Sequence, residues 1–138
     1  MTDSPKTVRF AIDAPTALRL VRDRVTDDAH PPLVAPAVLR SHVLSMLYRE
    51  ARDGLLDEAT ARRQLEGLAS LKIRLLGDRV SRATAWRLAR QLDWEDTAPA
   101  EYLAVATLQA DVLVAGDDRI AAAATGLVPL AEYGDLIR

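Results

Sequence analysis

The stretch RFAIDAP, residues 9–15, places a carboxylate directly after a short apolar run. Residues 8–12 carry the β-branched and aromatic side chains that are typical of a buried strand, and residues 14–24 have the apolar spacing of an amphipathic helix. Pro15 falls in the first turn of that helix, where proline is tolerated. Asp13 is therefore predicted to stand at the carboxyl end of a strand.

The same arrangement recurs in DVLVAGDD, residues 111–118, where an apolar run leads into Asp117 and Asp118. The other expected strands lie at residues 33–34, 72–76 and 128–130. The expected helices cover residues 14–24, 37–52, 80–92, 97–109 and 120–124, with a further one after Asp57 that completes a helical hairpin at about 37–71. Short strands that alternate with helices predict a parallel sheet covered by helices, a three-layer α/β/α sandwich.

Single residues mark several boundaries in this pattern. Pro36 is expected to open the long helix, and Gly54 is expected to end it. Asp57 and Asp96 stand where they can cap the helices that follow them, because aspartate is a favoured residue at a helix amino terminus.

The composition is that of one compact domain over residues 1–138, with 49% hydrophobic and 28% charged residues. The absence of cysteine excludes disulfides, thiolate metal sites and a thiol nucleophile, and we expect a cytoplasmic protein. The start MTDSPKTV has no leader pattern, and no apolar run approaches the roughly 18–20 residues that span a bilayer. A net charge of −2 gives no global attraction for polyanions, although a local basic strip would.

Ligands of parallel sheets collect at the carboxyl ends of the strands. Asp13 and Asp117 are predicted to meet at that edge, and unpaired carboxylates repel each other unless a cation neutralises them. Hard oxygen ligands suit Mg²⁺ or Mn²⁺, so the pair predicts a divalent metal site. The alternative is that each aspartate does no more than cap the helix that follows it.

Four segments, taken in order, resemble the PIN domains, and within them the VapC-like ribonuclease toxins of bacterial toxin-antitoxin systems. They are FAIDAPTAL (10–18), LVAPAVLRSHVLSMLYREARDG (33–54), TAPAEYLAVA (97–106) and DVLVAGDDRIAAAA (111–124). The resemblance spans nearly the whole chain. It implies a nuclease, a hydrolase that gathers three or four acids around one or two Mg²⁺ or Mn²⁺ ions and cleaves RNA.

Within that resemblance, Asp13 and Asp117 match two of the family's acids. His42 stands where the long second element usually carries an acid, and Pro99 stands where the late helix often carries one. Imidazole binds Mn²⁺ but is a poor ligand for Mg²⁺, and proline cannot ligate a metal. Ala115 replaces a hydroxyl residue that often precedes the last acid.

Asp96 and Glu101 are the candidates to replace the acid lost at Pro99. Asp96 lies three residues before Pro99 and shares its helix face, whereas Glu101 lies about 200° away but has a longer side chain. The expected catalytic residues are Asp13, Asp117, Asp96 and Glu101, and the expected metal ligands are Asp13, Asp117, Asp96 and His42. The alternative roles are a helix cap for Asp96, a solvated position for Glu101 and a local hydrogen bond for His42.

The resemblance also implies a mechanism and partners. A metal-activated water would attack an RNA phosphodiester without a covalent enzyme intermediate. The implied partners are the RNA substrate, a cognate antitoxin whose arginine reaches the acidic groove, and a second copy of the chain in a homodimer. The helical hairpin, with Leu47 and Leu65, is the expected contact surface, and no membrane association is expected.

Two other classes of function stay open. The departures at His42, Pro99 and Ala115 favour a degenerate PIN domain that is weak or inactive in catalysis and acts as a binding or regulatory module. A response-regulator-like domain with a phosphorylated aspartate is the third reading. Such domains carry a second acid after the first strand and a lysine at the end of a late strand, and this chain has neither in place.

Overall fold

A computed structural model describes residues 7–26 and 29–137 of the chain. Its centre is a parallel four-stranded sheet in the order β3-β2-β1-β4. The strands are β1 (Phe10–Ile12), β2 (Leu33–Pro36), β3 (Arg74–Leu76) and β4 (Val112–Val114). In this register Ala11 of β1 lies between Val34 of β2 and Leu113 of β4.

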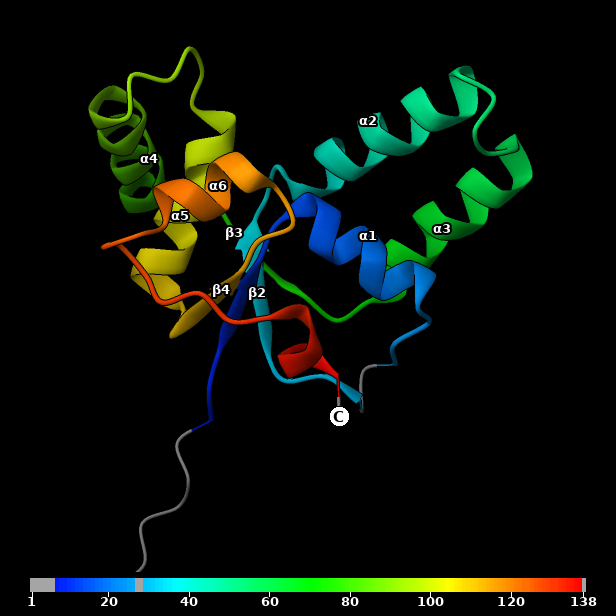
Figure 1. Ribbon diagram of the computed structural model, residues 1–138, viewed down its shortest axis with the longest axis horizontal. Helices are drawn as coiled ribbons and strands as arrows, with labels where there is room; N and C mark the ends of the chain where they lie inside the picture. Colours follow the sequence, from blue (N-terminus) through cyan, green and yellow to red (C-terminus); the bar gives the residue numbers. More distant parts are fainter. Residues whose placement is uncertain (1–6, 27–28, 138) are drawn as a thin grey trace, which may run out of the picture.

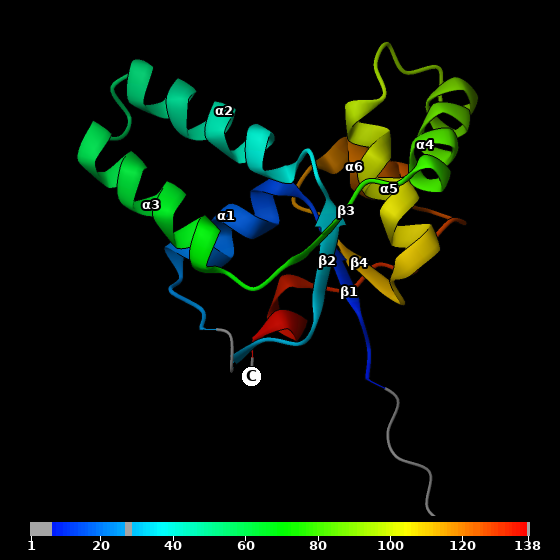
Figure 2. The same ribbon diagram turned by 180° about the vertical axis from the view of Figure 1, so that it is seen from behind.

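Helices cover both faces of the sheet, which is seen edge-on between them (Figure 1). One face carries α1 (Ala14–Arg22), α2 (Leu39–Arg52) and α3 (Glu58–Ser70), and the other carries α4 (Arg79–Gln91), α5 (Ala98–Gln109) and α6 (Asp118–Ala123). The view from behind shows the same division (Figure 2). The predicted three-layer α/β/α architecture is confirmed, with α2 and α3 as the expected hairpin.

The core lies where α5 and α1 pack on the two faces of the sheet. Helix α5 buries almost all of its central turns, because Ala100, Ala104 and Ala106 are small enough to let the backbone approach β1 and β2 closely. The largest fully buried side chains are Tyr102, Ile12, Leu18, Leu20, Leu39, Leu88, Leu103, Leu113 and Leu136. A single contiguous cluster of buried residues joins both layers of helices.

The structure corrects the predicted helix start at Pro36 and the predicted strand at 128–130. Pro36 is the last residue of β2 and does not open a helix; α2 begins at Leu39, because the sheet continues until the Ala37 amide bonds to the Leu76 carbonyl at 2.9 Å. The strand expected at 128–130 is only a bridge between Leu113 and Leu130. Proline at position 129 has no N–H, so it accepts a bond from Leu113 but cannot extend a ladder.

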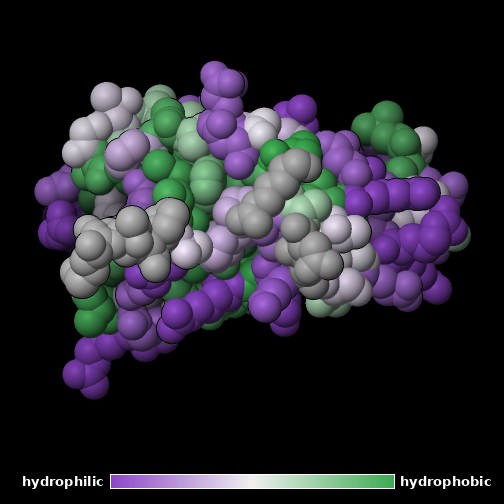
Figure 3. Space-filling view, turned by 90° about the horizontal axis from the view of Figure 1, so that it is seen from below, coloured by the Kyte–Doolittle hydropathy of each residue, from purple (hydrophilic) through white to green (hydrophobic). Residues whose placement is uncertain are grey.

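Two sequence features fall partly outside the described residues. The amino-terminal stretch MTDSPKTV lies there up to residue 6, and so do residues 27 and 28 of the predicted polar loop. Within the described part of the chain, no helix has both the length and the apolar character needed to cross a bilayer. The space-filling view of the amino-terminal edge of the sheet shows hydrophilic side chains gathered on the side of the hairpin (Figure 3).

Candidate functional site

The chain changes direction across the sheet at β1. From β1 it winds outward through β2 to β3, and it returns on the other side of β1 as β4. In such a sheet the switch point between two windings leaves a crevice at the carboxyl ends of the strands. Asp13 directly follows β1, and Asp117 follows β4 after two residues. The two aspartates therefore stand where an open parallel sheet most often binds ligands.

Asp13 is the N-cap of α1 and also a clamp between β1 and the turn after β4. Its Oδ1 accepts hydrogen bonds from the Thr16 amide at 3.1 Å, the Thr16 hydroxyl at 2.7 Å and the Gly116 amide at 3.0 Å. Its Oδ2 accepts one from the Asp117 amide at 2.9 Å. The predicted meeting of Asp13 and Asp117 at one edge is confirmed by this last bond, which joins residues 104 positions apart.

The premise that the Asp13 carboxylate is unpaired is wrong. The side chain is 0% exposed, and four N–H or O–H donors compensate its burial. Within this structure, the polar partners of the buried Asp13 carboxylate come from the chain itself.

Gly116 makes the clamp possible. A Cβ at this position would lie 2.8 Å from the Cβ of Pro15, which is closer than real side chains approach. Without a side chain, the turn after β4 can press against the first turn of α1, and the Gly116 and Asp117 amides reach the Asp13 carboxylate.

Asp117 caps α6, as the alternative interpretation had it. Its Oδ1 accepts hydrogen bonds from the amides of Arg119 at 2.8 Å and Ile120 at 3.1 Å. Its Oδ2 receives no hydrogen bond within the described residues, and the side chain is half-buried at the edge of a cleft. Asp117 is therefore the more accessible of the two predicted acids.

The cleft has a volume of about 460 Å³ and lies between α1, α2, α5 and α6. Three of the predicted site residues line it: His42, Asp96 and Asp117. Two arginines, Arg49 and Arg119, share the lining, so cationic and anionic groups face the same space. The guanidinium of Arg119 lies 4.8 Å from the centroid of the Trp94 ring, a distance at which a cation is attracted to the aromatic face.

His42 contacts Tyr102, and both residues line this cleft. The two rings stack with centroids 5.5 Å apart, and Nδ1 of His42 lies 2.6 Å from the Tyr102 hydroxyl. Burial raises the pKa of the Tyr102 phenol, and the carboxylates of Asp13, Glu101 and Asp117 raise it further. The Tyr102 phenol therefore keeps its proton, and its hydroxyl and Nδ1 of His42 share one hydrogen bond.

The two candidates for the lost acid, Asp96 and Glu101, lie in different surroundings. Asp96 does not cap α5, because the N-cap is Thr97; the Asp96 side chain is exposed and lines the cleft. Glu101 lies in the first turn of α5, half-buried, and is not among the residues that line the cleft. Burial raises the pKa of the Glu101 carboxyl, while the charges of His42 and Arg82 lower it.

The described residues show no preassembled group of divalent-metal ligands. Across residues 7–26 and 29–137, no three His, Asp or Glu side chains are grouped so that they could hold an ion. Asp13 is enclosed by amide and hydroxyl donors, and Nδ1 of His42 is engaged with the Tyr102 hydroxyl. A cation site also needs several oxygen ligands with free lone pairs, and the Oδ2 of Asp117 is the clearest one in the cleft.

Sequence reasoning missed three residues that build this site. Thr16 could have been found from the spacing DAPT, because a hydroxyl three residues after an N-cap aspartate commonly bonds back to it. Gly116, directly before Asp117, is a signal of close backbone approach. Nothing in the sequence indicates that Tyr102 bonds to His42, since the two residues are 60 positions apart.

Comparisons with known proteins address the fold. No family model and no curated protein matches the sequence. Among solved structures, the crystal structure of PAE2754 from Pyrobaculum aerophilum is similar, with a TM-score of 0.73 and 23% sequence identity over 95% of this chain and 93% of that one. At this identity the likeness shows that the two chains share a fold.

Proposed function

We propose that this chain is a PIN-like domain of the VapC type that binds RNA in the switch-point cleft and acts as a binding or regulatory module. The observation that carries the proposal is the Asp13 carboxylate, which is buried beneath the cleft and held by four donors of the chain itself. The acid that would be the first metal ligand of a nuclease serves here to hold the sheet edge together.

Two observations support the family part of the proposal. The four segments that resemble PIN domains follow one another in the family's order. The parallel sheet brings the first and the last of them into contact through the bond from the Asp117 amide to Asp13. The lack of cysteine supports a cytoplasmic location.

The cleft has features that suit an RNA strand. Arg49 and Arg119 supply guanidiniums that can hold phosphates, and Trp94 beneath Arg119 supplies an aromatic surface. The acids Asp96 and Asp117 limit the positive potential, so binding is expected to be weak and to depend strongly on salt.

Fluorescence anisotropy with a labelled single-stranded RNA tests this proposal. Arg119→Gln and Arg49→Gln should each weaken binding several-fold and reduce the slope of log affinity against log salt by about one. Arg52→Gln is the matched control, because Arg52 is an exposed arginine at the end of α2 that does not line the cleft. Equal affinities for all four proteins, or no binding at low salt, would contradict the proposal.

A divalent-metal-dependent ribonuclease of the VapC type is the second candidate. The convergence of His42, Asp96 and Asp117 on one cleft favours it, and it would require Mg²⁺ or Mn²⁺. The informative variant is Asp117→Asn, since asparagine also caps helices and the fold is retained. Cleavage of a quenched RNA in Mn²⁺ or Mg²⁺ that is abolished by this variant would establish the nuclease. Equal residual cleavage by the wild type and by Asp117→Asn would exclude the nuclease.

The proposal includes a homodimer formed through the hairpin, but its contact residues differ from the predicted ones. Leu47, one of the expected contact residues, is 2% exposed and belongs to the core, and Leu65 is half-buried. Leu44 and Tyr48 are 51% and 66% exposed and lie one turn apart on the same face of α2. Leu44→Lys should therefore shift the sedimentation coefficient toward the monomer, and unchanged sedimentation would exclude this face as the dimer interface.

A cognate antitoxin is the remaining proposed partner. An arginine of such a protein would be attracted to Asp96 and Asp117, which line the cleft proposed for RNA. Binding of the two is then mutually exclusive, so an antitoxin protein should displace the labelled RNA in the anisotropy experiment. Additive binding of RNA and antitoxin would contradict a shared cleft.

A further inference from the structure

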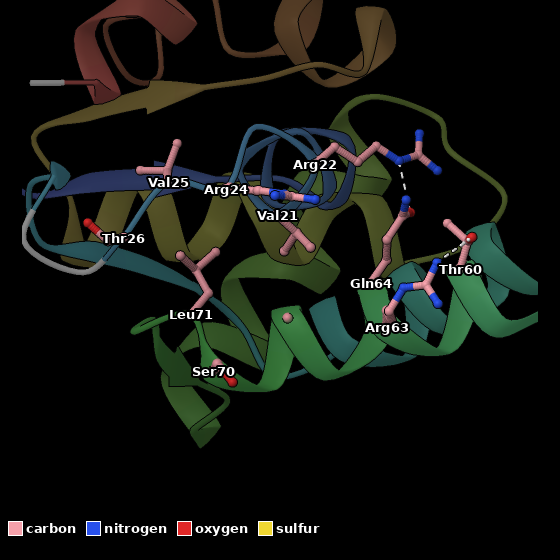
Figure 4. Close-up of a pocket in the computed structure, with 11 residues that line it drawn as sticks. Val21, Arg22, Arg24, Val25, Thr26, Thr60, Arg63, Gln64, Ser70 and Leu71 are labelled. Atoms are coloured by element: carbon pink, nitrogen blue, oxygen red, sulfur yellow. Dashed lines mark hydrogen bonds between the residues drawn. The ribbon is translucent and has the colours of Figure 1, made fainter.

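A second cavity lies away from the switch-point cleft, between the carboxyl end of α1 and helix α3. Its volume is about 640 Å³, which is within the range of small-molecule sites. Figure 4 shows side chains of α1 and of α3 pointing toward each other across this space. We propose that this α1–α3 pocket binds a small organic anion, with the arginines holding a phosphate or carboxylate group and an aliphatic floor holding its carbon chain.

The charge of the lining carries the first half of the inference. The pocket is lined by the arginines Arg22, Arg24 and Arg63, and none of its described lining residues is acidic. Arg22 is already engaged, since it donates to Gln64 at 3.0 Å and pairs with Glu50. The Arg63 side chain makes one hydrogen bond with the described residues, to the Thr60 hydroxyl at 2.9 Å.

The guanidinium of Arg24 makes no hydrogen bond or ion pair with the described residues, and only the Arg24 backbone amide bonds, to the Val21 carbonyl at 3.1 Å. Arg24 and Arg63 line the same pocket, and the Arg63 guanidinium uses only one of its nitrogens in the bond to Thr60. A guanidinium presents paired N–H donors that match the oxygens of phosphate or carboxylate. Two such groups in one pocket, without a carboxylate among the described lining, favour an anionic ligand.

The apolar part of the lining carries the second half. Val21, Val25 and Leu71 line the pocket together with Gly67. The pocket has no aromatic side chain among its described lining, so it offers no surface on which a nucleobase could stack. An aliphatic body with one oxyanion head therefore fits this lining better than a nucleic acid strand does.

The conformation of Arg24 supplies a variant that separates binding from folding. Its φ is +55°, in the left-handed region that favours glycine, and it follows the C-cap of α1. Arg24→Gly therefore removes the guanidinium and at the same time removes the backbone strain of a non-glycine residue at positive φ. The variant should be at least as stable as the wild type, so a loss of binding cannot be attributed to unfolding.

Amide NMR shifts of the labelled full chain test the proposal, with inorganic phosphate, butyl phosphate and butyrate as probes. Butyl phosphate or butyrate should shift the amides of Thr26 and Gly67 in a saturable way, and whichever binds tighter identifies the head group. Butyl phosphate should bind at least about threefold tighter than inorganic phosphate, because its methylenes are buried on the apolar floor. Arg24→Gly and Arg63→Gln should each weaken binding about tenfold, and Arg52→Gln should not change it.

Several results would overturn the proposal. One is a shift that stays linear up to about 10 mM of every probe, which is the mark of nonspecific contact. Others are equal binding by Arg24→Gly, or shifts confined to Gly116 and Asp117 in the other cleft. Pocket shifts that appear with a single-stranded RNA but with no small probe would assign the arginines to a nucleic acid surface instead.

The chain's own acids provide a last test. Asp27 and Asp28 follow Thr26 in the sequence and lie outside the described residues. If the wild type fails to bind while the Asp27→Asn/Asp28→Asn variant binds, these carboxylates occupy the arginines and the proposal fails. The switch-point proposal is unaffected by this outcome, because Arg24 and Arg63 do not line that cleft.

Discussion

At the scale of single residues, Asp13 combines two tasks that are usually separate. It caps α1 through Thr16, and it also accepts the amides of Gly116 and Asp117 from the far end of the chain. Because four donors converge on this buried carboxylate, a residue that cannot accept all four bonds leaves buried N–H groups without a partner.

Asp13→Asn should therefore destabilise the protein by about 3 kcal/mol, because the amide NH₂ turns a donor toward N–H groups that need an acceptor. Asp117→Asn is the matched comparison and should stay within about 0.5 kcal/mol of the wild type, since asparagine is as good an N-cap as aspartate. Urea unfolding measures both free energies. Equal effects of the two substitutions would mean that the clamp contributes nothing beyond a cap.

Glu101 gives a pH-dependent prediction. Burial is the largest influence on its carboxyl pKa and raises it above the ordinary 4.5. Between the unfolded and the folded pKa, the folded protein holds a proton that the unfolded chain has lost, so stability falls as pH rises through this window and stays reduced above it. Glu101→Gln cannot titrate and should therefore gain stability relative to the wild type at pH 7 and not at pH 3.

Urea unfolding of both proteins at the two pH values measures this difference. Glu66→Gln is the control, because Glu66 is an exposed glutamate on α3. A Glu101→Gln protein that gains as much at pH 3 as at pH 7 would show that the effect does not arise from the carboxyl charge.

At the scale of elements, the contact between α1 and α3 depends on Gly67. A Cβ at this position would lie 2.8 Å from Cγ1 of Val21, so the two helices pack more closely than an alanine would allow. Gly67→Ala should cost about 1 kcal/mol, since the strain exceeds the gain in helix propensity. In a Val21→Ala background the same change should stabilise the protein, by up to about 1 kcal/mol.

Thermal unfolding of the wild type, both single variants and the double variant closes this cycle. Additive effects would refute the close contact, because residues that touch are expected to show coupling.

The helices and strands were predictable where the spacing of apolar residues and the position of capping residues indicate the same boundary. The strand and helix around Asp13, and those around Asp117, follow directly from apolar runs that end in capping residues. The prediction that Pro36 opens a helix was wrong because proline is compatible both with the first turn of a helix and with the end of a strand. The hydrogen bond from the Ala37 amide to the Leu76 carbonyl shows that the strand continues here. The prediction that Asp96 caps α5 was wrong by one residue, because Thr97 is the N-cap and the sequence pattern does not fix a helix end to a single residue.

At the scale of the whole molecule, the two edges of the sheet differ. The outer side of β4 is joined to the chain by the bonds between Leu113 and residues 129 and 131, whereas β3 ends the sheet with exposed or half-exposed residues. Amide hydrogen exchange should thus be slowest in β1 and at least about tenfold faster in β3, because protection follows burial and pairing. Equal protection of β1 and β3 would show that β3 is covered by another molecule.

The candidate site was predictable in its location and not in its chemistry. The alternation of strands and helices was enough to bring Asp13 and Asp117 to one sheet edge. The donors that surround Asp13 are the Thr16 hydroxyl and the backbone amides of Thr16, Gly116 and Asp117, and every residue except proline carries a backbone N–H. A sequence therefore shows where charges gather, whereas the neutral groups that compensate them emerge only from the fold.

The Asp13 clamp has a consequence for biogenesis. During synthesis, β1 and α1 leave the ribosome about a hundred residues before the Gly116 and Asp117 amides exist, since those bonds span 103 and 104 positions. Until then Asp13 lacks two of its four donors, and the loop that must close is as long as most of the chain. A nascent chain arrested before residue 116 should therefore stay sensitive to proteolysis at this edge, and the last strand to be translated locks the first.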